Sequence, residues 1–299
     1  MKSEKVTVPS LVARKAGGPK IAMVTAYDAT FAQLFDRGGA DVLLVGDSLG
    51  MVVQGRSNTL PVTLEEICYH GRAVARAVRR AHVVGDMPFM SFQVSPERAL
   101  DAAGTMMKTG GFEAVKLEGG TVVAEQVRAM VRVGIPVMGH VGLLPQSVHA
   151  MGGFKIQGRS EEAGAAVLDD ARALVDAGVY AIVLEGLPTD LAQRVTAAVP
   201  VPTIGIGAGP HCDGQVLVCY DMLGMYDEVR PRFVKRFAEL GSAIVSAMQQ
   251  YVAEVGDGSF PSAEHSFAPK PAPLLTGADA VVPSQEPGYG PAEEEEPRR

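Results

Sequence analysis

The chain has 299 residues, 47% of them hydrophobic and 20% charged, and it carries a formal net charge of −7. This size suits one α/β barrel or two smaller domains. Because the chain has no basic excess, we expect neither nucleic acids nor anionic membrane surfaces as partners. With no apolar run of about 18 residues, no secretory signal and three cysteines in no metal-binding pattern, the sequence predicts a cytoplasmic protein with free thiols.

Eight short apolar segments recur along the chain, and most of them are separated by enough residues for a helix. They begin near Ile21, Asp41, His82, Ala114, Pro136, Ala181, Pro202 and Val216. Each is hydrophobic almost throughout, which is typical of strands buried on both faces of a parallel sheet. The sequence therefore predicts eight parallel strands.

Three of the intervening segments carry clear helix boundaries. A hydroxyl side chain that can cap a helix opens each of them, at Thr63, Ser95 and Ser160. Glu66 completes a capping box at the first of these helices, and Pro96 occupies the first helical position of the second. Glycines end the second and third segments, at Gly110–Gly111 and at Gly178.

Strands that alternate with helices in this way predict a (β/α)8 TIM barrel. An open, doubly wound sheet remains the alternative, because periodicity alone does not show that a sheet closes. The last residues differ in kind, since they are rich in proline, lack apolar periodicity and include four consecutive glutamates. Such a segment buries too little apolar surface to offset its ordering entropy. We therefore expect a barrel domain over residues 1–267 and a disordered tail over 268–299.

Polar side chains stand near the carboxyl ends of the predicted strands, where active sites of such barrels form. They are Asp47, Ser48, Asp86, Lys116, Glu118, His140 and Glu185. Neighbouring parallel strands lie about 4.8 Å apart, so Asp47 and Asp86 are expected within reach of one cation. Lys116 and Glu118 are two residues apart on one strand and therefore face the same side.

Two carboxylates this close repel each other in a pocket of low dielectric constant, and a divalent cation would compensate their charge. Oxygen ligands and the lack of a Cys/His pair with zinc spacing favour Mg²⁺ over Zn²⁺. A single aspartate after a strand is also typical of a helix cap or a turn, and a single histidine such as His140 is typical of a protein core. Glu185 is harder to explain structurally, because a carboxylate on an apolar strand is costly to bury without a partner or a task.

These residues by themselves indicate a metal-assisted enzyme that acts on a small anionic substrate with a carbonyl group. Longer stretches then narrow the interpretation: "VTAYDATFAQLFDRGGADVLLVGDSLGMVVQG", "TLPVTLEEICYH", "VVGDMPFMSF", "AVKLEGG", "GHVGLLPQSVHAMGGFKIQGR" and "TIGIGAGPHCDGQVLVCYDMLGM". Together they resemble the ketopantoate hydroxymethyltransferase family, and the resemblance runs from Thr7 to Phe267.

The resemblance implies a barrel of the phosphoenolpyruvate/pyruvate type. It also implies an enzyme that transfers a one-carbon unit from 5,10-methylenetetrahydrofolate to 3-methyl-2-oxobutanoate. The product would be 2-dehydropantoate (ketopantoate), on the route to pantothenate and coenzyme A. The matching positions imply Mg²⁺ ligands at Asp47, Asp86 and Glu118, oxo-acid contacts at Asp47, Ser48, Asp86 and Lys116, and a proton acceptor at Glu185. We place His140 as a residue that orients the substrate or a ligand, and the family implies a homo-oligomer, commonly a decamer.

Two other functions remain open from the sequence. One is a lyase on the same barrel type that cleaves a carbon–carbon bond next to a 2-oxo acid without folate. Such relatives commonly use a cysteine as the acid, and no cysteine here stands in a recognisable strand-end motif of that kind. The other is a barrel that binds an oxo acid or a folate as a sensor, and such a protein would not need Glu185.

Overall fold

The computed structural model describes residues 4–226 and 231–267. These residues form two compact units, one that ends at Ala247 and one that begins at Met248. The tail predicted over residues 268–299 lies outside the described residues, so its disorder and the domain boundary at 267 stay predictions. Among the described helices, none is both long enough and apolar enough to cross a membrane.

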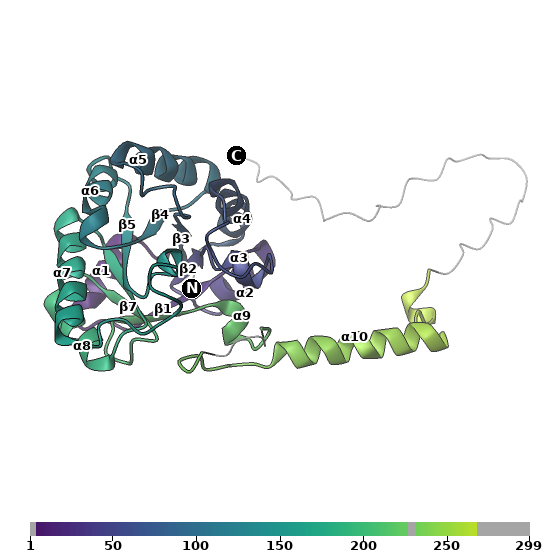
Figure 1. Ribbon diagram of the computed structural model, residues 1–299. Helices are drawn as coiled ribbons and strands as arrows, with labels where there is room; N and C mark the ends of the chain where they lie inside the picture. Colours follow the sequence, from purple (N-terminus) through teal and green to yellow (C-terminus); the bar gives the residue numbers. More distant parts are fainter. Residues whose placement is uncertain (1–3, 227–230, 268–299) are drawn as a thin grey trace, which may run out of the picture. The chain divides into compact units, whose positions relative to one another are not determined.

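Within the described residues, eight parallel strands close into a barrel in chain order, with β8 hydrogen-bonded to β1 (Figure 1). They are β1 (Ile21–Thr25), β2 (Val42–Val45), β3 (His82–Asp86), β4 (Ala114–Glu118), β5 (Val137–Gly142), β6 (Ala181–Glu185), β7 (Thr203–Ile206) and β8 (Gly214–Leu217). The predicted barrel is confirmed and the open sheet is wrong. Only β8 differs clearly from expectation, because it begins two residues before the apolar run at Val216.

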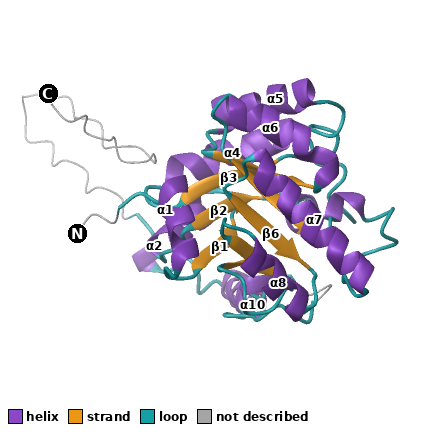
Figure 2. Ribbon diagram, turned by 90° about the vertical axis from the view of Figure 1, so that its left-hand side faces the viewer, coloured by secondary structure: helices purple, strands orange, loops and turns teal. Residues whose placement is uncertain are grey.

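Helices surround the strands, as the side view shows (Figure 2). They are α1 (Val8–Val12), α2 (Ala29–Arg37), α3 (Leu49–Val52), α4 (Leu64–Ala77), α5 (Pro96–Thr105), α6 (Ala124–Arg132), α7 (Glu161–Ala177), α8 (Thr189–Ala198) and α9 (Cys219–Met222). A further helix, α10 (Leu240–Asp257), spans the boundary between the two units and has no buried residue. The caps predicted at Thr63, Ser95 and Ser160 each accept a backbone hydrogen bond, and Glu66 completes its capping box.

The second predicted helix does not stay α-helical to its terminal glycines. Helix α5 ends at Thr105 and the chain continues as a π-helical turn, Met106–Gly110, before Gly111 adopts φ +75°. The ring of Phe112 packs against this turn, and a Cβ on Gly110 would lie 2.5 Å from that ring. Close packing therefore requires glycine at position 110, and the positive φ at the end of the helix favours glycine at position 111.

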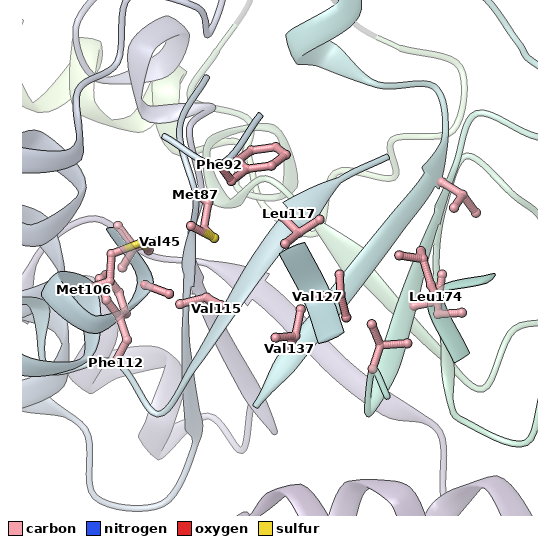
Figure 3. Packing of buried hydrophobic residues seen from close by; sticks show 14 of the residues in the cluster. Val45, Met87, Phe92, Met106, Phe112, Val115, Leu117, Val127, Val137 and Leu174 are labelled. Carbon is pink, nitrogen blue, oxygen red and sulfur yellow. The ribbon is translucent and has the colours of Figure 1, made fainter. Parts of the chain in front are cut away.

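Side chains of the barrel strands alternate between two apolar layers. Val115 and Leu117 of β4 point outward into the layer that contains Val127 of α6 and Leu174 of α7 (Figure 3). Ala114, on the same strand, belongs instead to the cluster inside the barrel. The residues that share its parity, Lys116 and Glu118, therefore point into the barrel as well. This alternation carries polar groups to the carboxyl end of the barrel interior.

Candidate active site

A cavity of about 720 Å³ opens at the carboxyl end of the barrel. All seven polar residues singled out in the sequence line it, from Asp47 after β2 to Glu185 at the end of β6. The barrel thus brings together side chains that are 138 positions apart in the chain, between residues 47 and 185.

The strongest contact in the cavity is an ion pair between neighbouring strands. Lys116 of β4 lies opposite Asp86 of β3 in the sheet register, and its Nζ lies 2.7 Å from Asp86 Oδ1. Both residues are at most 4% exposed. Burial by itself lowers the pKa of Lys116, but the carboxylates of Asp86, Glu118 and Asp47 raise it above its ordinary value. The lysine is therefore a permanent positive charge.

One ammonium group cannot neutralise all of the acids around it. Burial and repulsion from Asp86 raise the pKa of Asp47 from 3.8 to about 7, although Lys116 opposes the shift. Burial and the charge of Asp47 likewise raise the pKa of Glu118 well above its ordinary value. Glu118 Oε1 is buried and has no hydrogen-bond partner. The cavity therefore holds an excess of acceptors that calls for additional positive charge or hydrogen-bond donors.

Gln146 organises these acids, and the sequence analysis did not identify it. It lies in the 3₁₀ turn Pro145–Ser147 after β5 and is 5% exposed. Its Nε2 donates to Asp47 Oδ2 at 3.0 Å and to the Met87 carbonyl at 2.9 Å, and its backbone N–H donates to Glu118 Oε2 at 2.9 Å. Gln93 donates in turn to its Oε1 at 3.0 Å. One residue thus fixes carboxylates from two different strands.

His140 of β5 lies between two carboxylates. Its Nε2 is 3.3 Å from Glu185 Oε2, and its Nδ1 is 3.9 Å from Glu118 Oε1. Burial and the charge of Lys116 lower the pKa of this histidine, and Glu185 opposes that shift. Neither ring nitrogen has a well-aligned hydrogen-bond partner. A neutral imidazole in this position can orient Glu185 or exchange a proton with it.

Ser48 is held by a second residue that the sequence analysis missed. Tyr27, which follows β1, lies 2.9 Å from Ser48 Oγ through its hydroxyl group, and its ring is buried. His70 contacts the Tyr27 carbonyl at 2.6 Å. The hydroxyl of Ser48 therefore has a fixed position at the wall of the cavity, from which it can orient a bound anion.

The donor set fits a hard divalent cation. The backbone N–H of Asp47 donates to Asp86 Oδ2 at 3.3 Å, and the charge of Asp86 raises the pKa of the Asp47 carboxyl. Glu118 contributes the unpartnered oxygen described above. In the described part of the chain, no group of three or more His, Cys, Asp or Glu side chains is arranged to hold a metal ion. The donors present are carboxylate oxygens, the ligand type that hard divalent cations prefer.

Comparison with known proteins assigns the chain to a family. A sequence profile of ketopantoate hydroxymethyltransferase matches residues 5–263. The chain belongs to this family. The 3-methyl-2-oxobutanoate hydroxymethyltransferase of Moorella thermoacetica is 57% identical over 263 residues, which cover 88% of this chain and 98% of that protein. The protein of the same name from Anaeromyxobacter sp. is 53% identical over 290 residues, covering 96% and 95%.

Two solved structures with other names have a fold similar to that of this chain. The phosphoenolpyruvate phosphomutase of Streptomyces platensis superposes with a TM-score of 0.59 at 15% identity, covering 88% of this chain and 92% of that one. A 2,3-dimethylmalate lyase of the PEP mutase/isocitrate lyase superfamily gives 0.56 at 18% identity, covering 86% of each chain. At these identities the likeness shows the fold alone, and it confirms the predicted barrel type.

Proposed function

We propose that this protein transfers a hydroxymethyl group from 5,10-methylenetetrahydrofolate to 3-methyl-2-oxobutanoate and forms ketopantoate, the precursor of pantothenate and coenzyme A. Membership of the ketopantoate hydroxymethyltransferase family carries the proposal. The buried Lys116–Asp86 pair, set among Asp47 and Glu118 in one cavity, supports it. With a divalent cation bound to compensate these carboxylates, such a site would suit a small acid whose reaction develops negative charge.

The first chemical step would be removal of the proton on C3 of the oxo acid. Glu185 is the proposed base, because it is at the cavity wall with a side chain 18% exposed and with His140 beside it. As the C3–H bond breaks, its electrons form a C2–C3 double bond and negative charge moves to the keto oxygen. Lys116 offsets the carboxylate of the substrate, and Ser48 holds its orientation by a hydrogen bond.

The enolate carbon then forms a bond to the methylene carbon of the folate. The bonds from that carbon to the folate nitrogens break, the nitrogens take up protons, and one water molecule supplies the oxygen of the new hydroxyl group. The products are ketopantoate and tetrahydrofolate. Since both substrates must occupy the cavity together, the proposed mechanism requires space beyond the oxo-acid site.

We assign Asp47 and Asp86 as ligands of Mg²⁺, with Glu118 as the third carboxylate. When bound, the ion would supply Lewis-acid stabilisation of the charge on the keto oxygen. The raised pKa of Asp47 and the unpartnered oxygen of Glu118 support this assignment, because a cation would relieve both. We also propose a cytoplasmic homo-oligomer, a decamer as is common in the family, which light scattering of the purified protein would test.

Mass spectrometry of the product tests the proposal directly. The enzyme is incubated with 3-methyl-2-oxobutanoate and methylenetetrahydrofolate, once with Mg²⁺ and once with EDTA. We expect ketopantoate only with the metal. Product in both samples would remove the metal assignment. If folded protein formed no ketopantoate but cleaved a 2-oxo acid, the folate-free lyase would be favoured. The cysteines do not support that lyase, because Cys68, Cys212 and Cys219 are all buried and none of them lines the cavity.

A further inference from the structure

The cavity has two chemically different sides. The sector from β2 to β6 carries the acids, Lys116 and His140, whereas the sector of β7 and β8 is apolar. Ile206, Val216 and Val218 line this second side. The ring of Phe233 packs over Gly207, where a Cβ would lie 2.9 Å from it. An apolar wall that includes an aromatic ring suits a ring system better than a small charged acid.

The volume of the cavity also exceeds what the oxo acid needs. Cavities of roughly 300–1,000 Å³ accommodate drug-sized ligands, and this one measures about 720 Å³. The acceptor, 3-methyl-2-oxobutanoate, has only five carbon atoms. The acids of β2 to β4 account for its binding, and the sector of β7 and β8 remains for a larger partner.

One carboxylate lies on the apolar side, and the proposed mechanism does not use it. Helix α9 follows β8 in the chain (Figure 1) and contains Asp221. Asp221 lines the cavity. It is half-buried, and its carboxylate accepts no hydrogen bond from any residue in the described part of the chain. Burial raises the pKa of Asp221, and the charge of Arg236 opposes the shift. A carboxylate in this setting gains from two donors on a ligand.

Two exposed cations, Lys155 and Arg232, also belong to the lining of the cavity. Across the described ranges, no acidic side chain forms an ion pair with either of them. Phe154 and Ile156 lie beside Lys155 and are 53% and 48% exposed, so apolar surface continues to the rim. The lining thus combines a half-buried carboxylate, an apolar wall and two exposed cations.

We propose that the sector of β7 and β8 is the folate subsite, in which Asp221 accepts two hydrogen bonds from the pterin and Lys155 and Arg232 face the glutamate tail. The inference rests on the proposed one-carbon donor. The 2-amino group and N3–H of a reduced pterin are adjacent donors that match the two oxygens of a carboxylate. The aminobenzoyl-glutamate portion is apolar and then anionic, so it can contact the apolar wall and the exposed cations of the same cavity.

Asp221→Asn tests the inner end of this subsite, because the amide replaces one acceptor by a donor and keeps the shape. Calorimetric titration with tetrahydrofolate under anaerobic conditions should show a dissociation constant raised about 10- to 100-fold, as expected for loss of charge-assisted hydrogen bonds. Asp190→Asn, an exposed carboxylate in the first turn of α8 that does not line the cavity, is the matched control and should bind like the wild type.

Exchange of the C3 proton of 3-methyl-2-oxobutanoate in D₂O, without folate, monitors the oxo-acid half of the site. Proton NMR should show the same exchange rate in Asp221→Asn and in the wild type. Unchanged folate binding in the variant overturns the subsite, and so does exchange that falls as much as folate binding. Wild-type protein that exchanges the proton but does not bind tetrahydrofolate would instead overturn the proposed donor.

An analogue assigns the contact to the pterin edge. 2-Desamino-tetrahydrofolate lacks one of the two donors, so it should bind the wild type more weakly than tetrahydrofolate does. The same analogue should lose little further affinity in Asp221→Asn, because the partner of the missing group has already been changed. Additive losses from the two changes would mean that Asp221 does not contact this edge, and they would overturn the proposal.

The outer end is tested by the length of the glutamate tail. Wild-type protein should bind tetrahydrofolate triglutamate more tightly than the monoglutamate, and the preference should weaken as salt increases. The double variant Lys155→Gln/Arg232→Gln should lose the preference and keep the deuterium exchange. A preference that survives in the double variant would show that other residues bind the tail, and it would overturn the assignment of these two cations.

Discussion

The two ends of the barrel contain the same kinds of charged residues but treat them differently. At the carboxyl end, Lys116 pairs with Asp86, while Asp47 and Glu118 are buried with raised pKa values. At the amino end, Asp41 accepts hydrogen bonds from Arg14 and Arg80 at 2.7 to 2.9 Å and from the N–H of Ala22. The first arrangement leaves charge uncompensated, and the second satisfies it.

The pKa shifts express this difference. Burial alone would raise the pKa of Asp41, but its hydrogen bonds to the two arginines and to Ala22 lower it instead. Glu113 behaves similarly at the same end, because hydrogen bonds from His82, Lys5 and the Val83 N–H outweigh burial and bring its pKa to about 2. Acids at the amino end therefore stabilise the fold, whereas acids at the carboxyl end destabilise it in return for a reactive site.

The largest effect should come from Asp47→Asn. We expect kcat/KM for ketopantoate formation to fall by about 10³-fold or more, because the variant removes a charge from the proposed metal site and keeps its size. Mass spectrometric detection of the product with saturating Mg²⁺ measures the loss. Turnover near that of the wild type would remove Asp47 from the set of metal ligands.

The same variant should be more stable than the wild type in EDTA above pH 7. The folded-state pKa of Asp47, about 7, lies above its ordinary value of 3.8, so the native protein holds a proton that the unfolded chain releases. Stability therefore decreases as the pH rises from about 4 to 7, by at most about 4 kcal/mol. Urea unfolding at several pH values should show that the free energy of unfolding depends less on pH in Asp47→Asn than in the wild type.

Asp41→Asn should have the opposite consequences. Removing one partner from a buried charge network costs about 3 kcal/mol, so the free energy of unfolding should fall while kcat changes little. Asp169→Asn is the control, because its 3.6 Å pair with Arg172 is largely exposed and should contribute less than about 0.5 kcal/mol. A kcat that fell with stability would mean that the amino end is coupled to catalysis.

Gln146→Ala should weaken the site by a smaller amount. We expect kcat/KM to decrease about 10- to 100-fold, because Asp47 loses one buried hydrogen bond while the backbone N–H to Glu118 is retained. Mg²⁺ affinity, measured by calorimetry, should decrease as well. Gln93→Ala, which removes only the donor to Gln146, should have a weaker effect of the same kind. Equal effects would argue against a direct role of Gln146 on Asp47.

The smallest effect concerns acid stability at the amino end. The pKa of Glu113 is lowered to about 2 from 4.5, so its contribution is present above pH 4.5 and is lost as the pH falls toward 2. Because the side chain is 38% exposed, solvent screening reduces this contribution to about 1 kcal/mol. In urea titrations, Glu113→Gln should make the free energy of unfolding depend less on pH between about 2 and 4.5. Above pH 5, the variant and the wild type should show the same pH dependence.

Local patterns predicted the strands because most of them are nearly continuous apolar runs, and several end in or are followed by a polar residue. The start of β8 was less accurate, since Gly214 and Gln215 join the strand through pairing with β1 and carry no apolar signal of their own. The seven predicted site residues were found because they interrupt or follow apolar strands. Gln146 and Asp221 were missed, because a glutamine in a loop and an aspartate in a short helix look ordinary in a sequence.

The sequence by itself determined the alternation of strands and helices, the family and the acids at the strand ends, since these depend on residue types at short spacing. Only the tertiary structure decided that the sheet closes, that Gln146 reaches Asp47 across 99 positions, and that Asp221 lies on an apolar wall of the same cavity. It also decided which carboxylates have raised pKa values. Burial and charge–charge distance set those values, and both arise only when residues distant in the chain are packed together.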